Sequence, residues 1–451
     1  MRIRRPRPPR PDARPCVNPH AAGLDIGSEE IWACVPEDRD PQPVRSFGTF
    51  TPDLYMLAAW LHACQIETVA MESTGVYWIP VYEILEARGF QVHLVNARHL
   101  KHVPGRKTDV KDCQWIQYLH TCGLLSASFR PEAEMCASRA YWRHRATLLD
   151  YRAAHIQPMQ KALQQMNVQL SQVLTDITGT TGLAIIRAIV AGERDPVHLA
   201  RFRDPRCAHS TEDIAKALTG HYRAEHVFAL QQALALYDVY TAQVRECDAE
   251  IARQFQAITP VWGDELPPLD RQDKALSQSK NAPAYDARSL LYQLTGVDLV
   301  AIPGLHASTV QTIAAEIGLD MGKWPNAKAF CAWLGLAPRH EISGGKVLRR
   351  STLPTRNRAG QALRLAAQAA GRSQSGLGAF YRRMRARLGP QSAIGATAHK
   401  IARIIYHLLT HRTVFRDLSP EEYRQRTRAR EIAAMRKKAA RLGLTLVESQ
   451  A

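Results

Sequence analysis

The sequence lacks the patterns that would place the chain in a membrane or build it around a structural metal. No segment approaches the ~20 apolar residues of a membrane-spanning helix, and the Arg/Pro-rich start is not followed by the apolar stretch of a signal peptide. The nine cysteines are scattered, and none stands in the Cys-x-x-Cys spacing of zinc or redox sites. We therefore expect a cytoplasmic protein with reduced thiols and no membrane anchor.

What is abundant is positive charge. The 451 residues carry a formal net charge of +17, and 45% of them are hydrophobic, enough for two or three domains with cores of their own. Clustered Lys and Arg gain free energy by releasing counterions from phosphates, so the predicted partner is nucleic acid. A merely solvated basic surface is the alternative.

The first 130 residues alternate strands with helices. Three extended segments in a row predict an antiparallel meander, and the strand–helix alternation that follows implies parallel pairing with right-handed crossovers. This order is that of a ribonuclease H-like domain with an α/β fold. The predicted elements are strands over residues 21–26, 31–35 and 44–50, a helix over 54–64, a strand over 68–71, a helix over 77–88, a strand over 90–95 and a helix over 109–120.

Four acidic residues on this pattern predict a metal site. Asp25 falls in the first, central strand, and Glu72 ends the strand expected beside it. Asp109 and Asp112 are three residues apart and share one face if they open a helix. Like charges so close together are tolerated when cations neutralise them, and two Mg²⁺ ions about 4 Å apart would suit phosphodiester chemistry. The alternative for each acid alone is a capping or surface carboxylate.

Basic residues near these acids, among them Lys107 and Lys111, would hold a phosphate backbone, unless they belong to a solvated loop.

A rival class, actin-like ATPases and sugar kinases, has a first phosphate loop much like Gly-Leu-Asp-Ile-Gly-Ser. That class needs a second nucleotide-binding half with its own Asp-Gly-rich loop, and the sequence shows none.

The middle of the chain is predicted to be helical. Long helices over residues 143–173 and 226–255 would pair as a coiled-coil-like arm, either as a dimer interface or as a hairpin within one chain. Residues 259–286, rich in Pro, Asp, Gln and Ser, have the composition of a flexible linker.

After the linker, residues 297–318 have the pattern of a helix-hairpin-helix element. The turn at Pro303 and Gly304 would direct the amides of the following helix at a phosphate, giving contact without base reading. His306 stands where that motif usually has glycine, and a plain helical hairpin in the core is the alternative.

Ser343, in Ile-Ser-Gly-Gly-Lys, precedes two glycines that would leave its hydroxyl exposed. A hydroxyl beside basic residues could attack a phosphodiester and hold a covalent intermediate, although most such segments are simple turns. The predicted phosphate-binding residues around the serine are Lys346, Arg349, Arg350 and Arg356.

Taken in order, these features resemble transposases of the insertion sequence 110 family, which are related to the Piv DNA invertase. The resemblance runs from about residue 21 to 410. It rests on the four acids, the helical middle, Ile302-Pro303-Gly304, Leu334-Gly-Leu-Ala-Pro338, Ser343-Gly-Gly-Lys346, Gln361-Ala-Leu-Arg-Leu-Ala-Ala367 and Ala379-Phe-Tyr-Arg-Arg-Met-Arg385.

The resemblance implies more than the residues alone. It implies a RuvC-like domain whose Asp25, Glu72, Asp109 and Asp112 bind Mg²⁺, and a transposase domain with a nucleophilic serine, for which Ser343 is the best match and Ser351 the reserve. This serine would attack one DNA strand and form a 5′-phosphoserine link in a composite site. The resemblance also implies guidance by a structured bridge RNA and a homo-oligomer, either a dimer or a tetramer.

Two other functions stay open at this point: a RuvC-like nuclease or Holliday-junction resolvase that uses water as its nucleophile, and a DNA-binding protein with a decayed metal site. The expected organisation is a basic tail over residues 1–19, a RuvC-like domain over 20–130, a helical arm over 131–258, a linker over 259–286, a mainly α transposase domain over 287–410 and a basic tail over 411–451.

Overall fold

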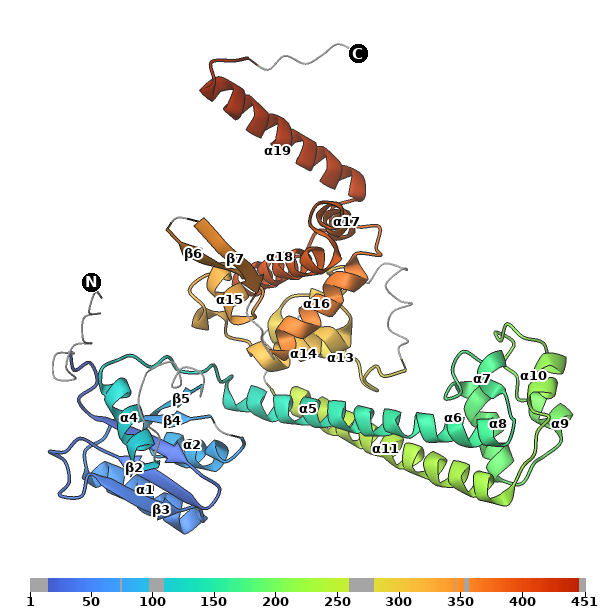
Figure 1. Cartoon of the computed structure of the whole chain (residues 1–451), viewed down its shortest axis with the longest axis horizontal. Coiled ribbons are helices and arrows are strands. Elements are labelled where there is room, and N and C mark those ends of the chain that lie inside the picture. Colours follow the sequence, from blue (N-terminus) through green and yellow to red (C-terminus); the bar gives the residue numbers. More distant parts are fainter. Residues whose placement is uncertain are drawn as a thin grey trace, which may run out of the picture. The chain divides into compact units, whose positions relative to one another are not determined.

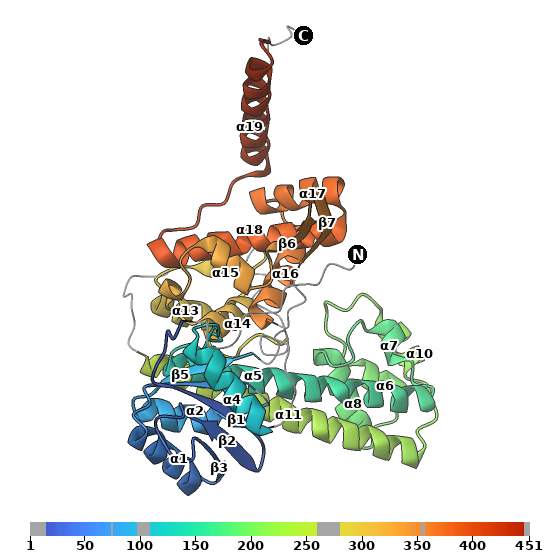
Figure 2. The same cartoon turned by 60° about the vertical axis from the view of Figure 1, so that its left-hand side comes forward.

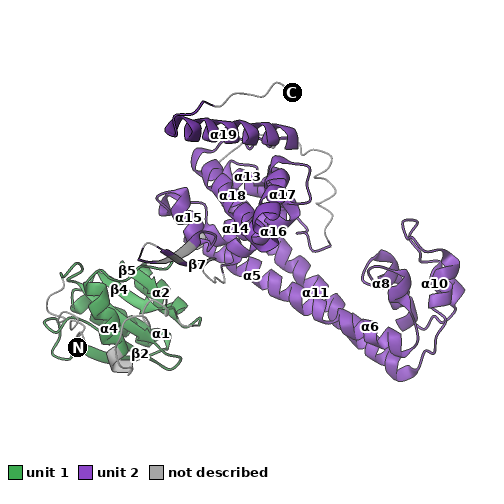
Figure 3. Cartoon of the chain, turned by 45° about the horizontal axis from the view of Figure 1, so that its top comes forward, with its two compact units in different colours: residues 1–130 green, residues 131–451 purple. Residues whose placement is uncertain are grey.

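The structure is a computed structural model. It describes residues 15–73, 75–96, 109–258, 280–344, 346–352 and 357–445; within these ranges the side chains of residues 109–111, 133–134, 339–342, 347 and 349–352 are not described. The chain divides into two compact units, Met1–Arg130 and Pro131–Ala451, shown in two colours in Figure 3.

Unit 1 is built on one five-stranded sheet in the order β3-β2-β1-β4-β5. β1 pairs antiparallel with β2 and parallel with β4, so it is the central strand, as predicted. The predicted order of elements is confirmed (Figures 1 and 2). The elements are β1 (Ala21–Ile26), β2 (Glu30–Cys34), β3 (Val44–Gly48), α1 (Thr51–Ala63), β4 (Thr68–Glu72), α2 (Trp78–Ala87), β5 (Gln91–Val95) and α4 (Asp109–Thr121).

The two faces of this sheet are covered by different helices because side chains alternate along each strand. Ala22, Leu24 and Ile26 of β1 face one way and share a buried cluster with side chains of α1 and α2. Gly23 faces the other way, against α4: a Cβ at this position would lie 2.3 Å from the backbone nitrogen of Gln117 and 2.5 Å from the carbonyl oxygen of Cys113. Only glycine lets α4 come this close to β1.

Unit 2 begins with an arm of paired helices: α5 (Ala133–Ala154) and α6 (Ile156–Gln165) lie along α11 (Ala224–Ala257) (Figure 1). Pairs such as Arg145 with Asp248 and Tyr151 with Tyr240 show that α11 runs antiparallel to α5. The helices therefore form a hairpin within one chain. Small helices follow α6: α7 (Leu170–Val173), α8 (Thr180–Val190), α9 (Pro196–Ala200) and α10 (Thr211–Ala217).

The prediction of one helix over residues 143–173 is wrong. α6 ends before Met166, and Asn167 takes the left-handed conformation with φ of 56°. Asparagine tolerates this conformation better than most residues, so the chain can turn there. The turn carries Met166 and Val168 into a buried cluster formed with α8, α9, α10 and the start of α11.

A buried ion pair ties the arm to the last residues of the predicted linker. Arg145 on α5 donates to Asp248 on α11 over 2.5 and 3.1 Å, and each side chain is only 3% exposed. Arg145 also donates to the carbonyl oxygens of Asn281 and Ala282, and Asp248 accepts from the amide of Ala284. The last residues of the predicted linker are thus fixed to the arm.

Asp248→Ala should destabilise the protein by about 3–5 kcal/mol, because it leaves the Arg145 guanidinium buried without a counter-charge. Asp238→Ala is the matched control: Asp238, also on α11, pairs with Arg187 where the side chains are 42% and 50% exposed. It should cost about 0–1 kcal/mol. Urea unfolding followed by circular dichroism measures both. Equal losses of stability in the two variants would mean that the buried ion pair does not fix residues 281–284 to the arm.

The rest of unit 2 is helical apart from one hairpin. β6 and β7 pair antiparallel, and this hairpin was not predicted. The predicted basic tail over residues 411–451 contains a helix, α19. The elements are α13 (Ala287–Thr295), η3 (Leu299–Ala301), α14 (Ala307–Ile317), η4 (Met321–Lys323), α15 (Ala327–Trp333), β6 (Pro338–Ser343), β7 (Lys346–Thr352), α16 (Arg358–Ala370), α17 (Gly376–Leu388), α18 (Pro390–His411) and α19 (Pro420–Arg441).

Across the described ranges, every helix is too short or too polar to span a lipid bilayer.

Candidate functional site

Asp25 and Glu72 lie at the same level on neighbouring strands. Leu24 of β1 is in register with Met71 of β4, and the two strands are parallel. The next residue on each strand, Asp25 and Glu72, is therefore also level, at the carboxyl ends of strands about 4.8 Å apart. Both side chains are partly exposed. The predicted placement of both acids at this edge of the sheet is confirmed.

Both carboxylates belong to the face of the sheet that α4 covers. Asp25 is two residues after Gly23, whose Cα touches α4, and Glu72 is two residues after Ala70, which packs with Ile116 of α4. The thiol of Cys113 is also near Asp25: its pKa is raised mainly by the hydrogen bond with Cys34 and by burial, and in part by the charge of Asp25. Sequence reasoning missed Gly23, although a glycine inside a strand is a signal of close backbone approach.

α4 begins at Asp109, so both predicted acids of this helix are on its first turn. Asp112 is partly exposed. Asp109 and Lys111 are helical, but their side chains lie outside what the structure describes, and Lys107 lies outside the described residues. Among the described side chains, no three Asp, Glu, His or Cys groups are close enough together to hold a metal ion, so Asp25, Glu72 and Asp112 alone do not make a closed site.

The donor set nevertheless fits a hard divalent cation. Asp25, Glu72 and Asp112 supply only carboxylate oxygens, which Mg²⁺ prefers. Asp25 and Glu72 share one face of the sheet, and Asp112 is on the first turn of α4, the helix that covers that face. Mg²⁺ commonly keeps several water ligands and uses one or two carboxylates. Asp25 and Glu72, which lie level on neighbouring strands, can supply these two carboxylates.

Ser343 lies at the tip of the β6–β7 hairpin. It is paired with Lys346 across a two-residue turn, and both residues are exposed. Gly344, the first turn residue, has φ of 55°, which glycine adopts readily and which two-residue hairpin turns require. The structure thus holds a serine hydroxyl and a lysine ammonium on adjacent strand ends. The side chains of Arg349, Arg350 and Ser351 are not described, and Arg356 lies outside the described residues.

Gly304 has a packing role. It sits in the turn between η3 and α14 with φ of 89°, and a Cβ there would lie 2.3 Å from the carbonyl oxygen of Ala366 and 2.7 Å from the backbone nitrogen of Ala370, both on α16. These contacts explain the glycine without a ligand and favour the alternative of a helical hairpin packed in the core. Phosphate contact by this turn stays a prediction.

Gly304→Ala should therefore destabilise unit 2 by at least ~1–3 kcal/mol, because alanine disfavours this φ and its methyl group would collide with α16 backbone. Thermal unfolding measures the change. Gly395→Ala is the control, since a Cβ at that position meets nothing within 4 Å and Gly395 is inside α18, where alanine is preferred. A Gly304→Ala protein as stable as wild type would contradict the packing role.

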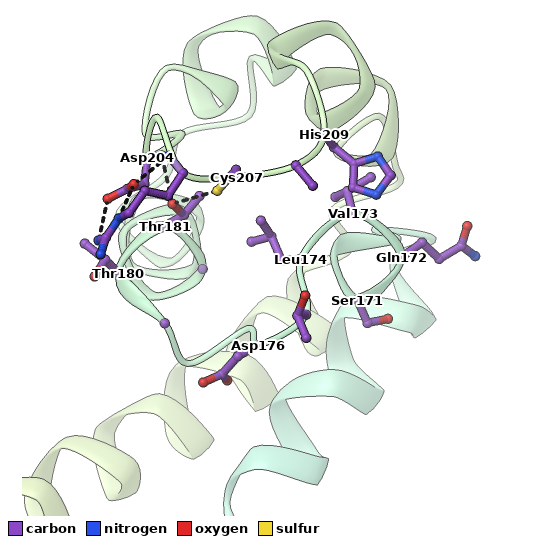
Figure 4. A pocket seen from close by; sticks show the side chains of 15 residues that line it. Ser171, Gln172, Val173, Leu174, Asp176, Thr180, Thr181, Asp204, Cys207 and His209 are labelled. Carbon is purple, nitrogen blue, oxygen red and sulfur yellow. Dashed lines mark hydrogen bonds and ion pairs between the residues drawn. The ribbon is translucent and has the colours of Figure 1, made fainter. Parts of the chain in front are cut away.

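A pocket of about 590 Å³ lies among the small helices at the end of the arm (Figure 4). Three of its polar groups are engaged with one another: Asp204 accepts two hydrogen bonds from the side chain of Arg206, and the hydroxyl of Thr181 accepts from the amide of Asp204. Arg206 accordingly lowers the pKa of Asp204 to about 2. No predicted site residue lines this pocket.

Comparison with known proteins gives the family. Residues 22–168 match a model for DEDD transposases of IS110, described as "Transposase", and residues 298–382 match "Transposase IS116/IS110/IS902 family". No curated protein matches the chain. The first match includes all four predicted acids, and the second includes Gly304, Ser343 and Lys346. The chain belongs to the IS110 family of transposases, enzymes that act on DNA in transposition.

Proposed function

We propose that this transposase excises and inserts its mobile element by cleaving and rejoining DNA strands, with Mg²⁺ held by a RuvC-like unit 1 and with Ser343 as the nucleophile. The observation that carries the proposal is the level placement of Asp25 and Glu72 on the sheet face covered by α4, whose first turn carries Asp112.

In unit 1, Asp25, Glu72 and Asp112, together with Asp109, would hold the metal. When bound, a divalent cation stabilises the negative charge that develops on the phosphodiester during cleavage. The protein's part is to aim its carboxylates at one place. Rigid strands and the close contact of α4 with Gly23 serve this purpose, because groups on packed elements keep their positions.

In unit 2, Ser343 supplies the attacking oxygen. Its Oγ forms a bond to phosphorus, the bond from phosphorus to the 3′ oxygen breaks, the hydroxyl proton is lost to solvent, and the 3′ oxygen takes up a proton. The product is a 5′-phosphoserine link and a free 3′ hydroxyl. Lys346, across the turn, would bind a phosphate oxygen as a point charge, with Arg349, Arg350 and Arg356 as further phosphate contacts.

The remaining proposals rest on family resemblance. We infer a bridge RNA as guide, a dimer or tetramer as the working assembly, and the cytoplasm as the location. Lys107 and Lys111 precede or open α4 in the sequence, so we assign them to the phosphate backbone near the acids.

The test is to incubate the purified protein with DNA carrying the element ends and with candidate guide RNA, and to look for a protein–DNA adduct on a denaturing gel. We expect an adduct in Mg²⁺ and none in EDTA. Cleaved DNA with free 5′-phosphate ends and no adduct would replace the proposal with a nuclease that uses water.

A further inference from the structure

The C-terminal helix α19 packs against other helices near its start, and most of its remaining residues are exposed. Ser419 caps it in a reciprocal capping box, and Pro420 is its first residue. Tyr423, 8% exposed, is its one buried residue and contacts α17 and α18: the Arg383 guanidinium donates to its hydroxyl, and Lys400 lies 5.1 Å from its ring centre. The start of α19 is thus packed against α17 and α18 of unit 2.

The open part of α19 carries one dense row of positive charge, with as many basic residues again spread around the rest of the helix. The helix has eight basic and three acidic residues. Four of the basic residues fall within an arc of about 60° at 100° per residue, and all four are exposed. Two of the acids, Glu421 and Glu431, fall on the opposite side, where they pair with Arg424 and Arg383. We call the four residues the basic stripe: Arg426, Arg430, Lys437 and Arg441.

Within the described part of the chain, the stripe holds four like charges together. One acid lies near it: hydrogen bonds with Ser419 and, in part, the charge of Arg426 lower the pKa of Glu422. None of its four side chains forms an ion pair with a described acidic side chain. The pKa of Lys400 on α18 lies below its usual value because of burial and because Arg430 is close, so a fifth cation borders the stripe. Such repulsion disfavours the free protein and is relieved when a polyanion binds.

We propose that the basic stripe binds the backbone of duplex DNA as a contact site separate from the catalytic residues. The exposed face offers cations and alanines but no aromatic ring for stacking on unpaired bases. The stripe extends from Arg426 to Arg441 for about 22 Å at 1.5 Å per residue, about two thirds of one turn of duplex DNA at ~34 Å. The matched family region ends at residue 382, before this helix begins. The inference needs the family's action on DNA but not the proposed serine chemistry.

The test compares two variants of the full chain that lose the same charge from the same helix. One replaces the basic stripe by glutamine (R426Q, R430Q, K437Q and R441Q). The other replaces the remaining four basic residues of α19 (R424Q, R428Q, R436Q and K438Q). Binding to a 40-base-pair duplex of random sequence is measured in EDTA over ~50–300 mM salt, where strand cleavage plays no part.

We expect the stripe variant to reduce the magnitude of the slope of log K against log salt by about 3–4, since each lost phosphate contact removes about 0.9 from that slope. The opposite-face variant should keep the wild-type slope. Equal changes in both variants, or no change in either, would overturn the proposal. So would a stripe variant that loses affinity for a structured RNA of equal length, or loses self-association, while its duplex binding stays intact. Failure of cleavage in the Mg²⁺ assay leaves this result unaffected.

Discussion

Asp25→Asn should reduce DNA strand cleavage by at least ~10³-fold while leaving DNA binding intact. Asparagine keeps the size of the side chain but removes the charge that we propose binds the metal, and a bound metal contributes several kcal/mol of charge stabilisation, each 1.36 kcal/mol being about tenfold in rate. Glu72→Gln should have a similar effect, because Glu72 is level with Asp25 on the neighbouring strand.

The matched control is Asp38→Asn in the same unit. Asp38 is 76% exposed and makes only a long ion pair of 3.6 Å with Arg39. This variant should cleave like wild type. Cleavage of a labelled duplex in Mg²⁺ is compared at equal fractions of DNA bound. If Asp25→Asn retains wild-type cleavage, the carboxylate pair has no part in the chemistry.

Ser343→Ala should abolish the covalent protein–DNA adduct and lower recombination by at least ~10³-fold, because no oxygen remains to attack the phosphodiester. The exposed hairpin tip should tolerate the change, since the lost hydroxyl is not buried and Gly344 still forms the turn. The adduct is measured by its retention in phenol or on a denaturing gel, and folding by circular dichroism.

Ser351→Ala separates the two serines of this hairpin. Ser351 is on β7, in register with Arg339 of β6, away from the tip. We expect Ser351→Ala to retain the adduct. An adduct that survives Ser343→Ala and disappears in Ser351→Ala would move the nucleophile role to Ser351.

The fold of unit 1 was largely readable from the sequence because its signals are local. Apolar runs of five or six residues, separated by turn residues, gave all five strands, and the strand–helix alternation gave the pairing directions. Asp25 and Glu72 could be placed since each is tied to a strand end. That the two side chains share one face of the sheet depends on the register of β1 and β4. Gly23, a glycine inside a strand, is the residue in the sequence that indicates which face α4 covers.

The fold of unit 2 was harder to predict from the sequence, because it depends on contacts between residues far apart in the chain. Arg145 reaches Asp248 and the last residues of the predicted linker, and no local pattern reveals that contact. The β6–β7 hairpin was not predicted because the pattern around Gly344 and Gly345 indicates a turn but does not reveal the strands on either side. Gly304 was assigned to phosphate binding from a motif, whereas the structure gives it a packing partner in α16.

The most direct test of the account is metal binding by the full-length protein, measured with Mn²⁺ by electron paramagnetic resonance and with Mg²⁺ as competitor. We predict that wild-type protein binds Mn²⁺, that Mg²⁺ displaces it, and that Asp25→Asn and Glu72→Gln each weaken binding by at least about tenfold, while Asp38→Asn does not. Equal Mn²⁺ binding by wild type and both site variants would contradict the claim that these carboxylates hold the metal.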